Sequence, residues 1–214
     1  MSKLLLDRRA FIVAGASTTL LAACGGNLIG PPEASPLYML RPKIPPTTTG
    51  VPVNWQISII LPEAPQSLDS DRIALVQPNG QMDYYANAAW QDRVPFLVQT
   101  ALIEAFEANT RIRAVGRDTD GLRSDYFLQT DIRDFQARYD VPDGIPTAVV
   151  RFSVKLIQAR GRVITQIMIA HSEVAATANS VPAVAAAFNQ ALSDALGQVV
   201  GWALDAPKPP PPPA

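Results

Sequence analysis

The chain is short of the residues that most catalytic sites use. It has one cysteine, Cys24, and one histidine, His171, in 214 residues. A single cysteine cannot form a disulfide within the chain, and one cysteine with one histidine cannot build a His/Cys zinc site. A serine–histidine arrangement would have to use His171. We therefore expect no metal site and no catalytic residue.

Two further catalytic signatures are missing. No serine lies in a Gly-x-Ser-x-Gly motif, and no glycine-rich phosphate loop precedes a predicted helix. ATP would therefore have to be bound by another subunit. Glu104 and Glu107 are three residues apart on a predicted helix, but a solvated helix surface explains them better than paired catalytic carboxylates. An enzyme acting on an envelope substrate is therefore less well supported than a docking protein or a lipid carrier, the other two roles considered for this chain.

Charge is also scarce. Charged residues make up 17% of the chain, hydrophobic residues make up 48%, and the formal net charge is −1. A nucleic-acid-binding protein normally has a basic surplus, so this composition argues against nucleic acid as a partner. The apolar content also argues against a disordered chain.

The first 23 residues have the features of a signal peptide. Lys3, Arg8 and Arg9 precede an apolar run from Phe11 to Ala23. That run is shorter than the roughly 20 residues needed to span a bilayer, but it fits the core of a signal peptide. Arg8 and Arg9, followed by Ala10 and Phe11, resemble a twin-arginine signal. An ordinary secretory signal with two arginines is the alternative, and both routes end outside the inner membrane.

The apolar run ends in Leu21, Ala22 and Ala23, directly before Cys24. This order resembles a bacterial lipobox, in which the cysteine receives a diacylglyceryl group and, after cleavage, an N-acyl chain. A buried structural cysteine is the alternative. Two or more acyl chains give stable membrane anchoring. Residue 25 is glycine rather than the aspartate that favours inner-membrane retention, so we expect the outer membrane of a Gram-negative bacterium.

Proline separates the mature chain into three parts. Residues 24–50 are rich in Gly, Pro and Thr and predict a tether, interrupted by the apolar patch 37–40. Residues 51–205 are long enough to form a folded domain. Residues 206–214 form a proline-rich tail, which is either a solvated end or a polyproline ligand for a partner.

Apolar alternation within residues 51–205 predicts strands. The expected strands are 53–61, 72–76, 81–85, 112–115, 126–139, 148–156 and 163–169. The first should have one face in water. In 126–139 the apolar residues change parity near Arg133 and Asp134, which predicts a β-bulge. A turn at Arg160 and Gly161 should place Val154 opposite Ile167, with His171 at the end of the same apolar face.

Two segments have helical periodicity. Residues 94–109 place apolar side chains on one face, and a second helix begins after Ser180, has Pro182 in its first turn and continues to Trp202. Gly197 lies inside this helix and should weaken it. The predicted fold class is α+β, with an antiparallel or mixed sheet and two long helices packed on one face.

The order of these motifs resembles the ABC-type transport auxiliary lipoprotein family. The resemblance covers nearly the whole chain and rests on the following residues: Cys24, Leu37 to Leu40, Leu61 and Pro62, Leu68 and Asp69, Arg72 and Ile73, Tyr84 and Tyr85, Trp90, Leu97, Leu102, Leu128, Phe135, Tyr139, and Ala187 to Trp202. It implies an outer-membrane lipoprotein that serves an ABC lipid transporter with an MCE-domain subunit.

The sequence leaves two main hypotheses for the mode of action. A docking protein would present an exposed strand edge or apolar patch to a partner, and self-association through such an edge would give a homo-oligomer. A lipid carrier would hold an acyl chain in a pocket between the sheet and the helices. Tyr84, Tyr85 and Trp90 could line a groove for a lipid or partner, although core packing at a strand-to-helix corner is the simpler interpretation.

Overall fold

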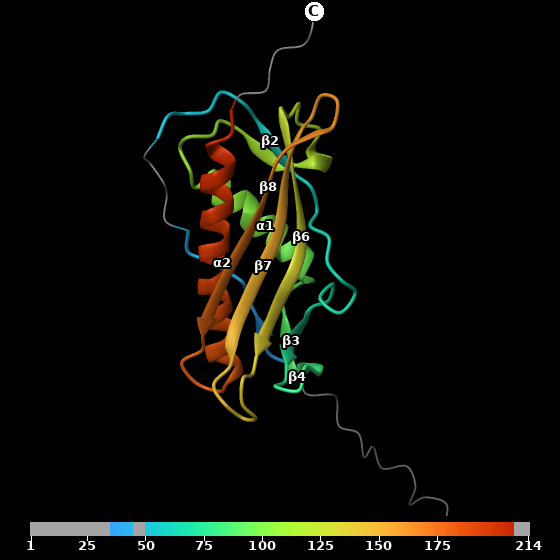
Figure 1. The fold of residues 1–214 in the computed structure, drawn as a ribbon, viewed down its shortest axis with the longest axis vertical. Helices are drawn as coiled ribbons and strands as arrows, with labels where there is room; N and C mark the ends of the chain where they lie inside the picture. The colour runs from blue at the N-terminus through green and yellow to red at the C-terminus, as the bar shows by residue number, and fades with distance from the viewer. Residues whose placement is uncertain (1–34, 45–49, 208–214) are drawn as a thin grey trace, which may run out of the picture. The chain divides into compact units, whose positions relative to one another are not determined.

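The structure, a computed structural model, describes residues 35–44 and 50–207. Within these residues, one mixed sheet of eight strands is covered by two long helices (Figure 1). The predicted α+β class, with a mixed sheet and two helices, is confirmed. The helices are α1 (Val94–Glu107) and α2 (Val181–Leu204). The strands are β1 (Leu37–Tyr38), β2 (Ile57–Ile59), β3 (Arg72–Val76), β4 (Met82–Trp90), β5 (Val115–Arg117), β6 (Tyr126–Arg138), β7 (Thr147–Gln158) and β8 (Val163–Ala175).

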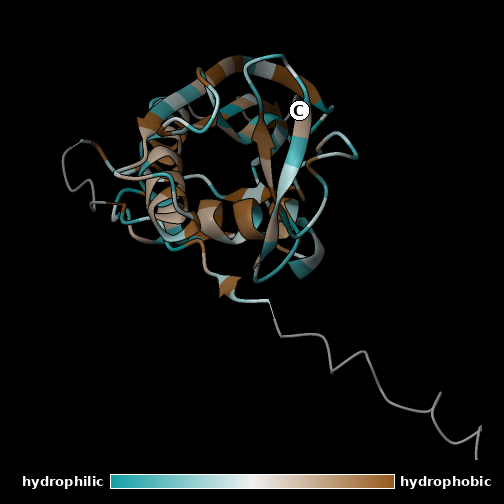
Figure 2. Ribbon diagram, turned by 90° about the horizontal axis from the view of Figure 1, so that it is seen from below, coloured by the Kyte–Doolittle hydropathy of each residue, from teal (hydrophilic) through white to brown (hydrophobic). Residues whose placement is uncertain are grey.

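The longest strands form an antiparallel unit in the order β6, β7, β8. The other edge of β6 pairs with two different strands, both parallel to it: β2 near its start and β3 near its end. From there β2 continues to β5, while β3 continues to β4 and β1. In this arrangement β8 forms one edge of the sheet. Figure 2, which looks along the long axis, shows the sheet curving around the helices.

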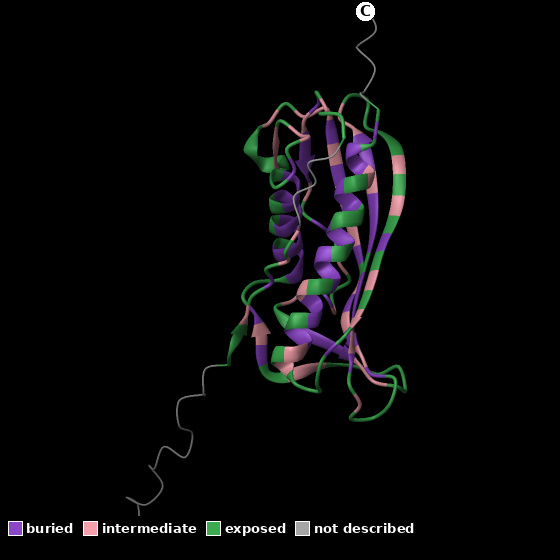
Figure 3. Cartoon of the chain, turned by 90° about the vertical axis from the view of Figure 1, so that its left-hand side faces the viewer, coloured by how far each residue is buried: buried purple, intermediate pink, exposed green. Residues whose placement is uncertain are grey.

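The core fills the space between the concave face of the sheet and the helices. In Figure 3 buried residues run along both helices and along the strands beside them. Phe188 of α2 stacks on Phe135 of β6, with 5.0 Å between ring centroids, and Trp90 meets Phe188 edge to face at 5.3 Å. These aromatic contacts join α2 to β6 and β4, so they fix where the helix lies on the sheet.

The bulge predicted in β6 is present. The register between β6 and β7 shifts between Ile132 and Asp134. Apolar residues on both sides of the shift therefore face the core, including Leu128, Ile132, Phe135 and Ala137, all of which are buried.

The predicted pairing between β7 and β8 is wrong by one residue. Near the turn, Ile157 pairs with Ile164 as predicted, but Leu156 then pairs with Gln166. Thr165 is the extra residue of a bulge, and beyond it Val154 faces Met168 rather than Ile167. Val154 lies in the core as expected, whereas Ile167 lies on the opposite face of the sheet, exposed to solvent.

Three short strands also differ from their predictions. The segment 53–61 has only β2 in strand conformation, and its predicted wet face is wrong because Ser58 is buried between β5 and β6. The strand expected at 81–85 continues to Trp90. The strand expected at 112–115 is β5, shifted toward the C-terminus.

Part of the segment assigned to the tether belongs to the fold. Leu37 and Tyr38 form β1 and pair with Ala89 and Trp90 of β4, and Leu40 is buried in the core. The side-chain amide of Asn189 in α2 accepts a hydrogen bond from the N–H of Arg41. The folded unit therefore begins before residue 51, with the apolar patch 37–40.

Candidate docking surface on the outer face of the sheet

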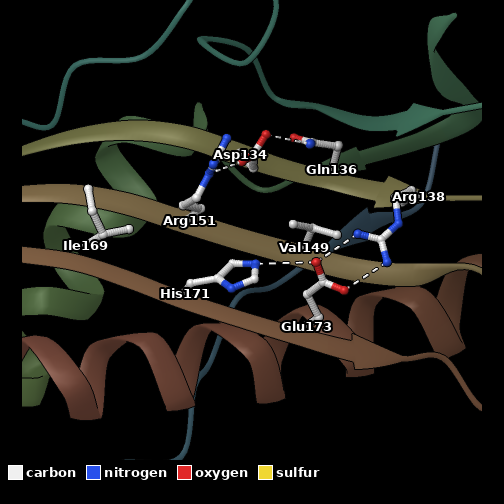
Figure 4. Close-up of a pocket in the computed structure, with 8 residues that line it drawn as sticks. All are labelled: Asp134, Gln136, Arg138, Val149, Arg151, Ile169, His171 and Glu173. Atoms are coloured by element: carbon white, nitrogen blue, oxygen red, sulfur yellow. Dashed lines mark hydrogen bonds and ion pairs between the residues drawn. The ribbon is translucent and has the colours of Figure 1, made fainter. Parts of the chain in front are cut away.

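The face of β6, β7 and β8 that points away from the helices carries a polar hollow. It has a volume of about 440 Å³, and Figure 4 shows its lining. The lining residues are Asp134, Gln136, Arg138, Val149, Arg151, Ile169, His171 and Glu173. These residues are brought together by strand alternation, because every second side chain of each strand projects from this face.

An ion pair with two parallel hydrogen bonds joins Arg138 of β6 to Glu173 of β8, across β7. Arg138 donates from both terminal nitrogens to the two carboxylate oxygens of Glu173, each at 2.8 Å, and from Nε to Asp140 at 3.1 Å. The hydrogen bond with Glu173 raises the pKa of Arg138, and the hydrogen bond with Arg138 lowers the pKa of Glu173. Both groups are thus held in their charged forms at neutral pH, in a planar two-point geometry that fixes their positions.

His171 lies on this exposed face, so its predicted place at the end of the apolar face is wrong. The register shift pairs it with Arg151 rather than Val150. Its Nε2 lies 3.3 Å from Glu173. No serine or cysteine is among the residues that line the hollow. The imidazole therefore has a carboxylate partner, and no hydroxyl or thiol nucleophile is among the residues that line the hollow.

Two further groups continue the charge pattern along the strands. Asp134 binds Arg151 and accepts a hydrogen bond from Gln136 at 2.9 Å. Asp131 lies 3.2 Å from Arg133 and 3.4 Å from Lys155. Each carboxylate is therefore neutralised by a neighbouring cation. Such a surface favours a partner that offers both hydrogen-bond donors and acceptors.

Aliphatic side chains border these charges on β8. Ile167 is 60% exposed and Ile169 is 57% exposed, and both project from the same face as His171. Val163 and Ile164 are also exposed at the start of the strand. A run of large aliphatic residues on a strand at the edge of a sheet is typical of a surface that binds another protein.

Comparison with known proteins assigns the chain to a family. The model of the ABC-type transport auxiliary lipoprotein component matches residues 38–200. The chain belongs to this family. The match begins within β1 and ends in α2, so it includes the N-terminal segment that packs on the sheet as well as the surface of β6 to β8.

Two relatives illustrate the similarity. The chain is 30% identical over 148 residues to the uncharacterized protein bll6063 of Bradyrhizobium diazoefficiens, an alignment that covers 69% of this chain and 39% of that protein. The chain thus spans about two fifths of the length of this relative. The crystal structure of protein XCC0632 from Xanthomonas campestris, a DUF330 protein, is similar with a TM-score of 0.73 and 29% identity, covering 79% of this chain and 94% of the other.

Within this family fold, the three aromatic residues predicted as contact residues have different surroundings. Trp90 is 1% exposed and belongs to the core. The Tyr84 hydroxyl donates to the carbonyl of Ser67 at 3.0 Å, and the guanidinium of Arg72 lies over its ring, 3.6 Å from the centroid. These contacts hold Tyr84 in place against the sheet, and its role as a partner or lipid contact stays a prediction.

Tyr85 has a different partner. Its hydroxyl lies 2.9 Å from the Tyr139 hydroxyl, which in turn donates to Asn179 at 2.8 Å. Burial raises the pKa of Tyr85, so the phenol stays protonated. The Asn179 side chain also donates to the carbonyl of Asp143 at 3.2 Å. Tyr85 therefore braces the loop between β6 and β7.

The predicted anchor lies outside the described residues. This holds for Arg8, Arg9, Leu21, Ala22, Ala23 and Cys24 alike, and lipidation of Cys24 stays a prediction. Among the described residues, no helix has both the length and the apolar character needed to cross a membrane. The tail beyond Pro207 also lies outside the described residues, and its role as a ligand stays a prediction.

Sequence reasoning did not single out the residues of the outer face. It gave the charged residues of β6 to β8 no role, and it placed Ile167 on the buried apolar face opposite Val154. One signal was available: apolar residues occur at both parities of 163–170, with Ile164, Met168 and Ala170 alternating with Ile167 and Ile169. A strand with two apolar faces and only one covered face must expose one of them.

Proposed function

We propose that this family member is a non-catalytic, outer-membrane-anchored lipoprotein that docks onto an MCE-domain subunit of an ABC lipid transporter. Diacylglyceryl and N-acyl chains on Cys24 serve as the anchor. Family membership supports a role in transport and a lipoprotein character. The lipobox at Leu21 to Cys24 supports the anchor, and Gly25 supports the outer membrane over the inner membrane.

The observation that carries the docking proposal is the exposure of Ile167 and Ile169 beside the charged face of the sheet. Burying a large aliphatic side chain is worth about 1.5–3 kcal/mol, so a partner that covers both residues gains substantial binding free energy. The surrounding ion pairs supply specificity because a wrongly placed charge is costly to bury.

The carrier hypothesis receives less support. An acyl chain held between the sheet and the helices would need space there, but large side chains occupy this region. Trp90, Phe135, Phe152 and Phe188 are all fully buried within it. Three of them are in direct aromatic contact. Binding a lipid there would require these rings to separate, at the cost of their packing free energy.

The test measures binding of the purified mature lipoprotein to the periplasmic part of the transporter's MCE-domain subunit. The doubly substituted variant Ile167→Asp/Ile169→Asp should weaken binding at least tenfold. The matched control is Val51→Asp, because Val51 is 79% exposed but belongs neither to β6, β7 or β8 nor to the residues that line the hollow. Equal affinities for the native protein and the double variant would place the docking surface elsewhere. Absence of binding by the native protein would refute docking to this subunit.

A further inference from the structure

The outer edge of β8 is closed at one point by a side chain of α2. The N–H of His171 donates to Oε1 of Gln198 at 3.1 Å, and Nε2 of Gln198 donates to the carbonyl of His171 at 3.0 Å. Both backbone groups of His171 therefore point away from β7. One residue further along the strand, the Ser172 hydroxyl donates to Asp194 of α2 at 3.1 Å.

The position of His171 fixes the direction of the backbone groups along the rest of the strand. In an antiparallel pair, the residues of one strand point their N–H and C=O groups alternately toward and away from the neighbouring strand. Ile169 and Ile167 lie two and four residues before His171 with continuous pairing to β7. Their N–H and C=O groups therefore also point away from β7, outward from the edge of the sheet.

This edge is protected at both ends but open between them. Gln198 covers His171 at one end. At the other end the bulge at Thr165 interrupts the strand, and bulges are a common device that prevents pairing at sheet edges. Among the described residues, β8 pairs with β7 alone. Residues 166–170 thus form a short unpaired stretch of the sheet edge, and this stretch contains the exposed residues Ile167 and Ile169.

We propose that residues 166–170 of β8 form a strand-addition site for an extended segment of the transporter subunit. This inference rests on the proposed docking function and specifies its mode. The N–H and C=O groups of Ile167 and Ile169 supply the backbone hydrogen bonds, as in other cases in which a peptide adds a strand to a sheet. The open stretch is about as long as a typical strand, so a short peptide segment suffices.

The charges near the site specify the chemistry of this segment. Arg160 and Arg162 lie in the turn at the start of β8, whereas Lys155 of β7, the direct neighbour of Ile167 on the outer face, is already paired with Asp131. A segment with β-branched or other aliphatic residues opposite Ile167 and Ile169, and with an acidic residue toward the turn, matches these groups. Such a segment also covers aliphatic surface that would otherwise promote aggregation.

Two substitutions at one position test the mode of binding. Proline in Ile167→Pro removes an N–H that points away from β7, so the pairing of β7 with β8 is retained, and proline is tolerated at such edge positions. Valine in Ile167→Val keeps the N–H, the β-branched shape and an aliphatic side chain with as many carbon atoms as that of proline. We expect at least a tenfold loss of affinity for the purified MCE-domain subunit with proline and no more than about a threefold loss with valine. Equal losses would overturn strand addition.

Amide hydrogen exchange on the native lipoprotein gives a second readout, which does not depend on any variant. Bound subunit should slow exchange at Ile167 and Ile169, while Met168, already paired with β7, changes little. Binding without this alternating protection would overturn strand addition but leave docking intact. Absence of binding would refute the docking function itself. If the same amides became protected in the lipoprotein alone as its concentration rises, the occupant would be a second copy, and the proposal would be wrong.

Discussion

Gln198 of α2 binds the backbone of His171 in β8 as a neighbouring strand would. Its amide accepts from the N–H and donates to the C=O of the same residue, at 3.1 and 3.0 Å. A glutamine amide has the same donor and acceptor arrangement as a peptide group. The helix therefore completes the hydrogen bonding of the sheet edge at one residue, and it also fixes how far strand pairing could extend along β8.

Replacing Gln198 should open this end of the edge. In Gln198→Ala, two hydrogen bonds are lost, each worth about 0.5–1.5 kcal/mol, so the free energy of unfolding should fall by about 1–3 kcal/mol. Self-association should increase because the exposed edge becomes longer. Urea unfolding and light scattering measure the two effects. Gln190→Ala is the control, because Gln190 bonds Asp194 rather than the sheet backbone. Identical behaviour of the two variants would show that Gln198 does not protect the edge.

Gly197→Ala should stabilise the protein. Gly197 lies in the interior of α2, and an added Cβ would meet no atom within 4 Å. Alanine is favoured over glycine by about 1 kcal/mol in a helix interior. We expect the melting temperature to rise by about 2–4 °C, measured by circular dichroism. Gly80→Ala is the contrast: space is also free there, but φ is +82°, so the same substitution should destabilise.

The pair formed by Arg138 and Glu173 should make stability depend on acid pH. The hydrogen bond with Arg138 lowers the pKa of Glu173 in the folded state. The stabilisation is therefore complete above the unfolded pKa of about 4.3 and is lost as pH falls through the lower folded pKa. Both side chains are partly solvated, so the effect should be about 0.5 kcal/mol. Comparing urea unfolding of the native protein and Glu173→Gln at pH 7 and pH 3 measures it; a constant difference would contradict the prediction.

Cys24→Ala should separate anchoring from folding. Without the thiol no diacylglyceryl group can be attached, so the protein should remain unprocessed or unlipidated and leave the outer-membrane fraction. The folded domain begins after residue 34, so its circular dichroism spectrum and melting temperature should not change. Membrane fractionation and mass spectrometry provide the measurement. Normal processing and normal membrane partition of the variant would refute the lipoprotein anchor.

The sequence correctly predicted those strands and helices whose apolar pattern along the chain matches their burial in the structure. Residues 72–76 form β3 with the expected bounds; α1 begins at the residue that the apolar pattern indicated, and α2 begins directly after Ser180 with Pro182 in its first turn. The bulge in β6 was predictable because the apolar residues change parity there. β1 was not predicted as a strand: it has two residues and pairs with β4 far along the chain, so only the apolar patch 37–40 indicated it.

The surface of β8 could not be predicted because both faces of the strand carry apolar residues. With Ile164, Met168 and Ala170 at one parity and Ile167 and Ile169 at the other, alternation alone does not select the buried set. Packing against α2 selects it: Ala170 is fully buried, and its small side chain permits a close approach of the helix. The candidate docking surface follows from this tertiary contact, which the sequence pattern does not contain.

The register of β7 and β8 can be tested with one substitution on each strand. Val154 is fully buried, so Val154→Asp places an unpaired carboxylate in the core and should prevent folding or cost several kcal/mol. Ile167→Asp should change the free energy of unfolding by less than about 0.5 kcal/mol, because the side chain lies in solvent beside Lys155. Expression yield and urea unfolding measure both variants.

The two variants discriminate between the register observed here and the one predicted from the turn. If Val154 and Ile167 faced each other in the core, both aspartate variants would unfold. In the observed register only Val154→Asp should do so. Ile167→Asp should remain folded, and the docking proposal predicts that it loses affinity for the transporter subunit. A folded Ile167→Asp variant with full affinity would agree with the observed register but would show that Ile167 is not part of the docking surface.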